Sequence, residues 1–202
     1  MNSSLTRGLA GALLALALLP PCRAPAAPSN PLGLKAGVFE PPRMAPDFTA
    51  RGSDGKPLTL SQFRGKLVLL EFGYTSCADV CPVSLAMLAD ARRKMGALAS
   101  QLQVLYVTVD PERDTPERMK NYLRNFDPTF IGATGTPQQM ARVRQDYGIS
   151  AVRKNIEGSK DYVIGHSSYL YFVDRKGSLR ALLPFGHSAA DVVHDATLLL
   201  QN

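Results

Sequence analysis

The chain has 202 residues, with 23 basic and 17 acidic side chains and a formal net charge of +6. It contains no dense run of Lys and Arg, so we expect no nucleic-acid partner. Residues 1–26 include two of the arginines and no acidic residue, so the remainder carries +4. Such a mildly basic surface weakly favours acidic protein partners or anionic lipid.

The N-terminus has the pattern of a secretory leader. Arg7 precedes a 12-residue apolar run over residues 8–19, and Ala24-Pro25-Ala26 offers an A-x-A cleavage site. We therefore expect residues 1–26 to be a signal peptide and the protein to be exported to the periplasm. An uncleaved anchor in the inner membrane is the alternative, although the run is shorter than the roughly 18 residues typical of a span. Lipidation of Cys22 is less favoured, because two prolines precede it.

A proline-rich tract follows the leader. Residues 20–46 hold eight of the chain's fifteen prolines, a composition typical of an extended, semi-rigid segment. We interpret residues 27–46 as a linker, which would hold the domain away from a membrane if the leader stays attached. Residues 47–202 are long enough to form one domain with a full core.

The predicted elements of this domain alternate between strands and helices. The turn signal at 53–56 predicts a small hairpin, and the apolar run 67–72 predicts a strand that is buried on both faces. The following elements, in chain order, are a helix after Pro82, a strand over 104–109, a helix starting at 114–117, a short strand at 130–131, a helix over 138–147, strands over 169–173 and 179–183 joined by a Gly-containing loop, and a helix over 190–200 capped by Ser188.

This order predicts an α/β fold of the thioredoxin-like sandwich type. Parallel strands are joined by helices, a hairpin and a last helix follow, and another hairpin comes first. The resulting architecture is a central mixed sheet flanked by helices, with an N-terminal β-hairpin. Open α/β sheets place their chemistry at the carboxyl ends of the strands.

Two cysteines stand at such a position. Cys77 and Cys81 follow the strand at 67–72 and lead into a helix. Residues four apart project to the same side of a helix, and a helix N-terminus lowers the pKa of a nearby thiol. The pair suits metal binding or reversible redox chemistry. In an exported protein, a structural disulfide is the third reading.

His166 supplies a third donor, 85 residues further along the chain. In a thioredoxin-like sandwich, the loop before the strand at 169–173 adjoins the cysteine loop, and His166 stands there in place of the proline of redox members. Two thiolates and one imidazole suit Cu(I) in trigonal geometry, and also Cu(II) with an added weak ligand. Zinc is less favoured, because structural zinc takes four protein ligands.

Several of these residues have plainer interpretations. A lone His before a strand is often a hydrogen-bonded loop residue, and His187 and His194 are most simply surface residues. The carboxylate of Asp79 either orients the cysteine loop or is solvated. The group Asp110, Arg113 and Asp114 either forms a charge network beside the site or caps the next helix.

Three segments together resemble the signatures of the Sco/SenC family. They are FGYTSCADVCP at 72–82, VTVDPERDTP at 107–116 and DYVIGHSS at 161–168, and the resemblance extends over roughly residues 43–202. It implies a thioredoxin-like, exported or membrane-tethered protein that binds copper through Cys77, Cys81 and His166.

The implied role is assembly of the binuclear CuA site in subunit II of cytochrome c oxidase, as copper donor, as thiol reductant, or both. An upstream copper donor and a thiol reductant are then further partners, and Cys77 and Cys81 would form the redox-active pair. A metal-independent thiol-disulfide oxidoreductase is the competing hypothesis.

The sequence departs from the family pattern at two positions. Ala78 stands where a proline usually follows the first cysteine, and Gly165 replaces an acidic residue often found before the histidine. The first change is expected to loosen the loop. The second removes a charge that would tune the imidazole or the metal, so we expect it to alter copper affinity and specificity while the three ligands remain intact.

Overall fold

The computed structural model describes residues 29–202, so the expected signal peptide or anchor at 1–26 lies outside the described residues. The strands are β1 (Gly37–Met44), β2 (Thr49–Gly52), β3 (Pro57–Thr59), β4 (Leu67–Gly73), β5 (Leu102–Thr108), β6 (Ile131–Thr134), β7 (Ala151–Asn155), β8 (Tyr162–His166), β9 (Tyr169–Val173) and β10 (Ser178–Pro184). The helices are α1 (Val80–Lys94), α2 (Pro116–Leu123), α3 (Pro137–Asp146) and α4 (Ala189–Gln201), with 3₁₀ turns at Leu60–Phe63 and Gly96–Gln101.

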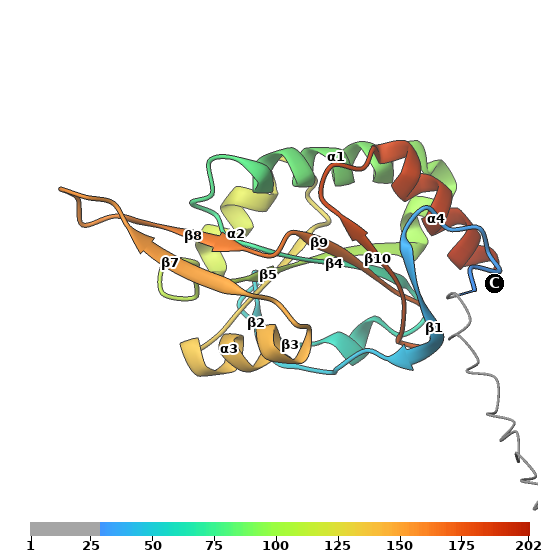
Figure 1. Cartoon of the computed structure of the whole chain (residues 1–202), viewed down its shortest axis with the longest axis horizontal. Coiled ribbons are helices and arrows are strands. Elements are labelled where there is room, and N and C mark those ends of the chain that lie inside the picture. Colours follow the sequence, from blue (N-terminus) through green and yellow to red (C-terminus); the bar gives the residue numbers. More distant parts are fainter. Residues whose placement is uncertain (1–28) are drawn as a thin grey trace, which may run out of the picture.

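Eight strands form one mixed sheet in the order β1-β10-β9-β4-β5-β6-β2-β3. The pairs β4–β5 and β5–β6 are parallel, whereas β9 runs antiparallel to β4. Helices α1 and α4 lie together on one side of the sheet and α3 on the other (Figure 1). This arrangement confirms the expected thioredoxin-like sandwich, and β2 pairs with β3 in the expected N-terminal hairpin.

The core is centred on β4 and β5. All seven residues of each strand are buried, because helices cover one or the other face along their length. On one face, Phe72 packs against the rings of Tyr147 and Tyr171. On the other face, α1 contributes Leu85 and Leu88, both fully buried. The carboxyl end of β4 is therefore a rigid support for the cysteine loop that follows it.

The N-terminal part of the fold begins earlier than expected. Residues 37–44, assigned above to the linker, form the edge strand β1 and pair with β10. The pairing is irregular between Val38 and Arg43, where Pro41 and Pro42 lie. Proline lacks a backbone N–H, so an interrupted edge strand is where a sheet accepts it. The buried carboxylate of Asp195 also accepts hydrogen bonds from the amides of Lys35 and Ala36, at 2.8 Å each.

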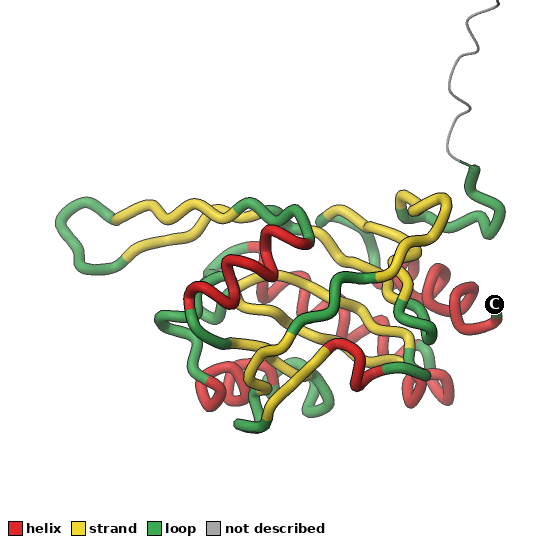
Figure 2. Tube along the Cα trace, turned by 90° about the horizontal axis from the view of Figure 1, so that it is seen from below, coloured by secondary structure: helices red, strands yellow, loops and turns green. Residues whose placement is uncertain are grey.

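A second sheet, which the sequence analysis did not predict, consists of β7 and β8 alone. Its strands pair antiparallel from Ala151–His166 at the base to Asn155–Tyr162, and the hairpin projects well beyond the body (Figures 1 and 2). Four of the five residues of β7 are exposed. Within residues 29–202, no helix is long and apolar enough to cross a membrane.

Candidate metal centre

The two cysteines lie where β4 passes into α1, as expected. Cys77 is in the connecting loop and half-buried, whereas Cys81 is in the first turn of α1 and only 2% exposed. The Cys77 amide donates a hydrogen bond to the Tyr74 carbonyl at 3.2 Å, which closes a turn. Both thiols are free, so the structural-disulfide reading does not describe this state of the protein.

Asp114 and Arg118 hold the loop ahead of Cys77. The buried Asp114 carboxylate accepts hydrogen bonds from the Thr75 hydroxyl and amide and from the Thr108 hydroxyl. Arg118 donates to the Thr75 hydroxyl at 2.7 Å and to the Ser76 hydroxyl at 2.9 Å. Asp114 was expected either to join a charge network beside the site or to cap the next helix. It belongs to the network, and Thr115 caps α2 instead.

The two thiols differ in acidity. A hydrogen bond from the Cys81 thiol lowers the pKa of Cys77 to about 3, with further help from His166 and from the amides of Asp79 and Cys81. The pKa of Cys81 is raised, first because its proton is shared with Cys77 and second because of burial. At neutral pH, the pair is a Cys77 thiolate beside a Cys81 thiol. The carboxylate of Asp79 is exposed and does not cap α1. The backbone amide of Asp79 contributes to the site, as a hydrogen-bond donor to Cys77.

His166 ends β8 and faces the cysteines. Its Nε2 lies 3.5 Å from Cys81 Sγ, and its Nδ1 lies 2.9 Å from the Ser167 carbonyl. Because a carbonyl only accepts hydrogen bonds, Nδ1 carries a proton, so Nε2 is the ring nitrogen that faces the sulfur and offers a lone pair whenever the ring is neutral. Burial acts to lower the pKa of His166, but the Cys77 thiolate and the Ser167 carbonyl raise it overall.

Arg113 and Tyr74 connect the histidine hairpin to the body. Arg113 Nε donates a hydrogen bond to the Asp110 carboxylate, and its Nη1 donates to the Tyr162 carbonyl at 3.1 Å. The Tyr74 hydroxyl accepts a hydrogen bond from the Ile164 amide at 3.2 Å, and the Tyr74 ring meets His166 edge to face. These contacts fix the position of β8 relative to the body, and therefore the distance between His166 and the sulfur atoms.

Glu71 is a functional candidate that the sequence analysis missed. It lies within the run interpreted as an apolar strand, and its side chain is buried, with Oε2 lacking any hydrogen-bond partner among residues 29–202. Burial raises its pKa to about 7, although Ser84 and the charge of His166 act in the opposite direction. An unusually placed acid in an apolar run is the signal that could have drawn attention to it.

The structure thus brings the three predicted ligands to one place. Among residues 29–202, however, no group of three or more His, Cys, Asp or Glu side chains already stands in a metal-holding arrangement. Two donor atoms bonded to one metal at roughly 2.0–2.3 Å lie roughly 3.5–4 Å apart, so the 3.5 Å between Cys81 Sγ and His166 Nε2 is compatible with a shared ion. The donor set fits copper, because two cysteine thiolates and one imidazole nitrogen are soft or borderline ligands once their protons have left. His187 and His194 lie on or before α4, where each faces an aspartate.

Comparison with known proteins gives a consistent result. The sequence model of the SCO1/SenC family matches residues 38–201. A "SCO2-like protein" from Rickettsia felis is 32% identical over 152 residues, which cover 74% of each chain.

Two solved structures have the same fold. Copper-bound ScoI of Bradyrhizobium japonicum is 34% identical with a TM-score of 0.72, over 78% of this chain and 99% of that one. The apo Sco1 protein of Thermus thermophilus is 33% identical with a TM-score of 0.73, over 84% and 97%. With a family match over most of the described residues and relatives above 30% identity, this chain belongs to the SCO1/SenC family.

Proposed function

We propose that this protein is a copper-binding assembly factor for cytochrome c oxidase. It would deliver copper to the binuclear CuA site of subunit II, or keep the cysteines of that site reduced. The observation that carries the proposal is the meeting of Cys77, Cys81 and His166 at the end of β4. The family match and the copper-bound relative from Bradyrhizobium japonicum support copper as the cargo.

The three proposed ligands are prepared to different degrees. Cys77 offers a thiolate at neutral pH without prior loss of a proton, whereas His166, whose pKa is raised, offers Nε2 only when its ring is neutral. Cys81 must give up its proton, because its pKa is raised. Loading copper should therefore release the proton of Cys81 and that of any His166 ring still charged, so affinity should rise with pH.

Release of the cargo follows from the low number of donors. Three protein ligands leave copper open to attack by a client's thiolates, so transfer can occur by stepwise ligand exchange. Trigonal coordination by two sulfurs and one nitrogen favours Cu(I), and Cu(II) would need an added weak ligand. Oxidation of the Cys77 thiolate and the Cys81 thiol to a disulfide releases two electrons and one proton and abolishes the site. A client disulfide can accept the two electrons and this proton, and becomes one thiol and one thiolate.

The cellular setting follows from the N-terminal sequence. A leader over residues 1–26 favours export to the periplasm, by cleavage or as an inner-membrane anchor. An upstream copper donor and a thiol reductant would be needed to load the site in an oxidising compartment.

Copper titration of the full chain, reduced and metal-free, tests the proposal. We expect one Cu(I) per chain and an affinity at least about 100-fold lower in His166→Ala, because one of three ligands is removed. His187→Ala is the matched control, since His187 pairs with Asp191 instead. Equal copper affinity in wild type and His166→Ala would contradict a three-ligand site.

The acidity of Cys77 favours a second candidate function, a metal-independent thiol-disulfide oxidoreductase. A thiolate with a neighbouring thiol can attack a client disulfide and then be resolved by that thiol. Reduction of a model disulfide in the presence of a Cu(I) chelator separates the two functions. Turnover that survives both the chelator and His166→Ala would favour the oxidoreductase.

A further inference from the structure

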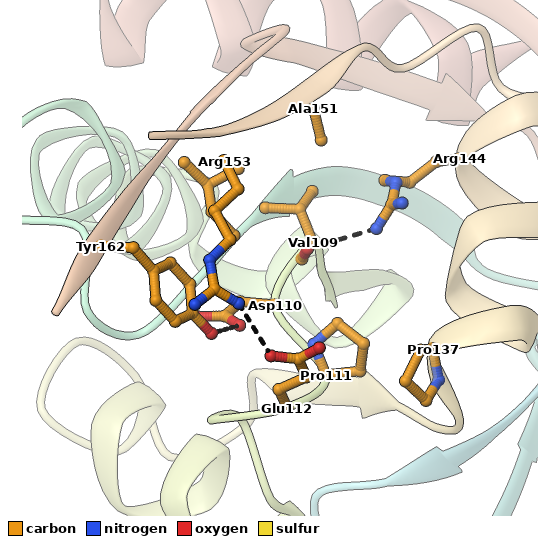
Figure 3. A pocket seen from close by; sticks show the side chains of 10 residues that line it. Val109, Asp110, Pro111, Glu112, Pro137, Arg144, Ala151, Arg153 and Tyr162 are labelled. Carbon is orange, nitrogen blue, oxygen red and sulfur yellow. Dashed lines mark hydrogen bonds and ion pairs between the residues drawn. The ribbon is translucent and has the colours of Figure 1, made fainter. Parts of the chain in front are cut away.

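A cavity of about 170 Å³ lies under the base of the β7–β8 hairpin. Ala151 and Arg153 of β7 and Tyr162 and Ile164 of β8 form its hairpin side, and the loop after β5 and helix α3 form the opposite wall (Figure 3). The cavity is separate from the proposed metal ligands, since none of the three lines it.

Two carboxylates, Asp110 and Glu112, and two guanidiniums, Arg144 and Arg153, line this cavity, and a third guanidinium, Arg113, reaches Asp110 from outside the lining. The Asp110 carboxylate is held by Arg113 and by the Tyr162 hydroxyl, and Glu112 is paired with Arg153 at 3.2 Å. Each acidic group in the wall therefore already has its cation or donor. Among the described residues that line the cavity, Arg144 is the cation without an acidic partner.

Arg144 is half-buried and has only a neutral partner within the described residues. Its Nη1 donates to the Val109 carbonyl at 3.2 Å, and no carboxylate of residues 29–202 lies within ion-pair distance. Burial alone lowers its pKa, so the charge is partly stripped of water without a compensating anion. Figure 3 shows the guanidinium of Arg144 on the opposite side of the cavity from the Arg153–Glu112 pair.

We propose that this cavity binds one carboxylate, with Arg144 as its ion-pair partner. A guanidinium carries five N–H donors in a planar fork, and a carboxylate is the anion that this fork binds through two parallel hydrogen bonds. The volume is close to the roughly 150 Å³ cavity that accommodates a benzene molecule, which suits a short acid. Pro111, Pro137 and Ile164 supply apolar wall against which the methylene groups of such an acid would pack.

The carboxylate comes either from a free small acid or from an acidic side chain of a partner protein. Either would bridge α3 and the hairpin, and Ala151 in the wall pairs directly with His166. If the proposed copper site is correct, occupancy of the cavity and copper affinity should influence each other reciprocally. The binding itself does not depend on copper.

Titration of the reduced, metal-free full chain with acetate and succinate, followed by backbone and Arg side-chain NMR signals, tests the proposal. We expect saturable shifts at Arg144, Ala151 and Ile164, and none with the neutral amides acetamide and succinamide at matched ionic strength. Arg144→Gln should weaken binding by about tenfold or more while retaining a donor for the Val109 carbonyl. Arg142→Gln is the matched control, because its side chain is 74% exposed on the same helix and pairs with Asp146.

A blocked Ala-Glu-Ala peptide identifies the source of the carboxylate. Tighter binding of this peptide than of acetate supports a protein side chain, whereas binding of succinate without the peptide supports a free acid. The absence of saturable shifts with every carboxylate, or equal affinity in wild type and Arg144→Gln, would overturn the proposal. Signals of β4 and β5 in each variant report whether the fold is intact.

Discussion

The two parts of the candidate metal centre come from regions that differ in packing. The cysteines follow β4, whose seven residues are all buried between helices and neighbouring strands. His166 ends β8 in a two-stranded hairpin that lies outside the main sheet and has mostly exposed residues. An isolated hairpin is only marginally stable in water, so β8 depends on its few contacts with the body.

This difference separates the stability of the fold from the geometry of the site. The sulfur atoms are positioned by the same core that holds the protein folded. The imidazole is positioned by Arg113, Tyr74 and the Ser167 carbonyl. Substitutions in the hairpin should therefore change metal binding at little cost in global stability, whereas substitutions below the cysteines should change both.

The largest difference between the two regions should appear on truncation of an apolar side chain. Leu70 in β4 is fully buried, so Leu70→Ala should lower the free energy of unfolding by about 2–5 kcal/mol. Val163 in β8 is 44% exposed, and Val163→Ala should cost less than about 0.5 kcal/mol. Urea unfolding followed by circular dichroism measures both. Similar losses for the two variants would mean that the hairpin belongs to the cooperative core.

The pH dependence of stability tests the packing below the cysteines, because Glu71 is buried there. Its pKa is about 7 in the folded protein against an ordinary value of 4.5, so the folded state binds the proton more tightly. Stability is therefore lost as pH rises from 4.5 through 7, by roughly 3 kcal/mol from this group. Glu71→Gln should remove that loss and unfold at higher urea than wild type at pH 8. Parallel pH profiles for the two proteins between pH 5 and 8 would show that Glu71 does not titrate as described.

Arg113 tests the attachment of the hairpin. Arg113→Gln loses charge-assisted contacts with Asp110 and the Tyr162 carbonyl, and we expect a stability loss of about 1–2 kcal/mol. Hydrogen exchange of β8 amides should accelerate while exchange in β4 changes much less, and copper affinity should fall with it. Lys154→Gln, an exposed change in β7, serves as the control. Uniform acceleration across β4 and β8 would indicate global destabilisation instead of release of the hairpin.

The smallest effect is expected at the cysteine loop itself. The exposed Asp79 side chain does not cap α1, so Asp79→Ala should change the free energy of unfolding by no more than about 0.5 kcal/mol. Asp114→Asn should be clearly more destabilising, because this buried carboxylate accepts bonds from Thr75 and Thr108. Thermal unfolding of the two variants side by side makes the comparison. A larger loss for Asp79→Ala would reverse these roles.

The sequence by itself determined the elements that depend on local signals. The continuous apolar run of β4, the helix starts at Thr115 and Ser188, and the Gly-containing turn before β10 all appear as expected. Cys77 and Cys81 were placed correctly at the end of β4, because a strand followed by a helix fixes where the intervening loop emerges.

Only the tertiary structure decided the features that rest on long-range contacts. Strand β1 exists because β10 offers it an edge, despite prolines that locally favour a linker. The β7–β8 hairpin is short and exposed, so its sequence carries little of the hydrophobic alternation by which strands are recognised, although Gly158 at its tip is a turn signal. Three features of the site arise between residues that are distant in the chain and that only packing brings together. They are the raised pKa of Glu71, the hydrogen bonds of Asp114 to the cysteine loop and the contact of His166 with Cys81.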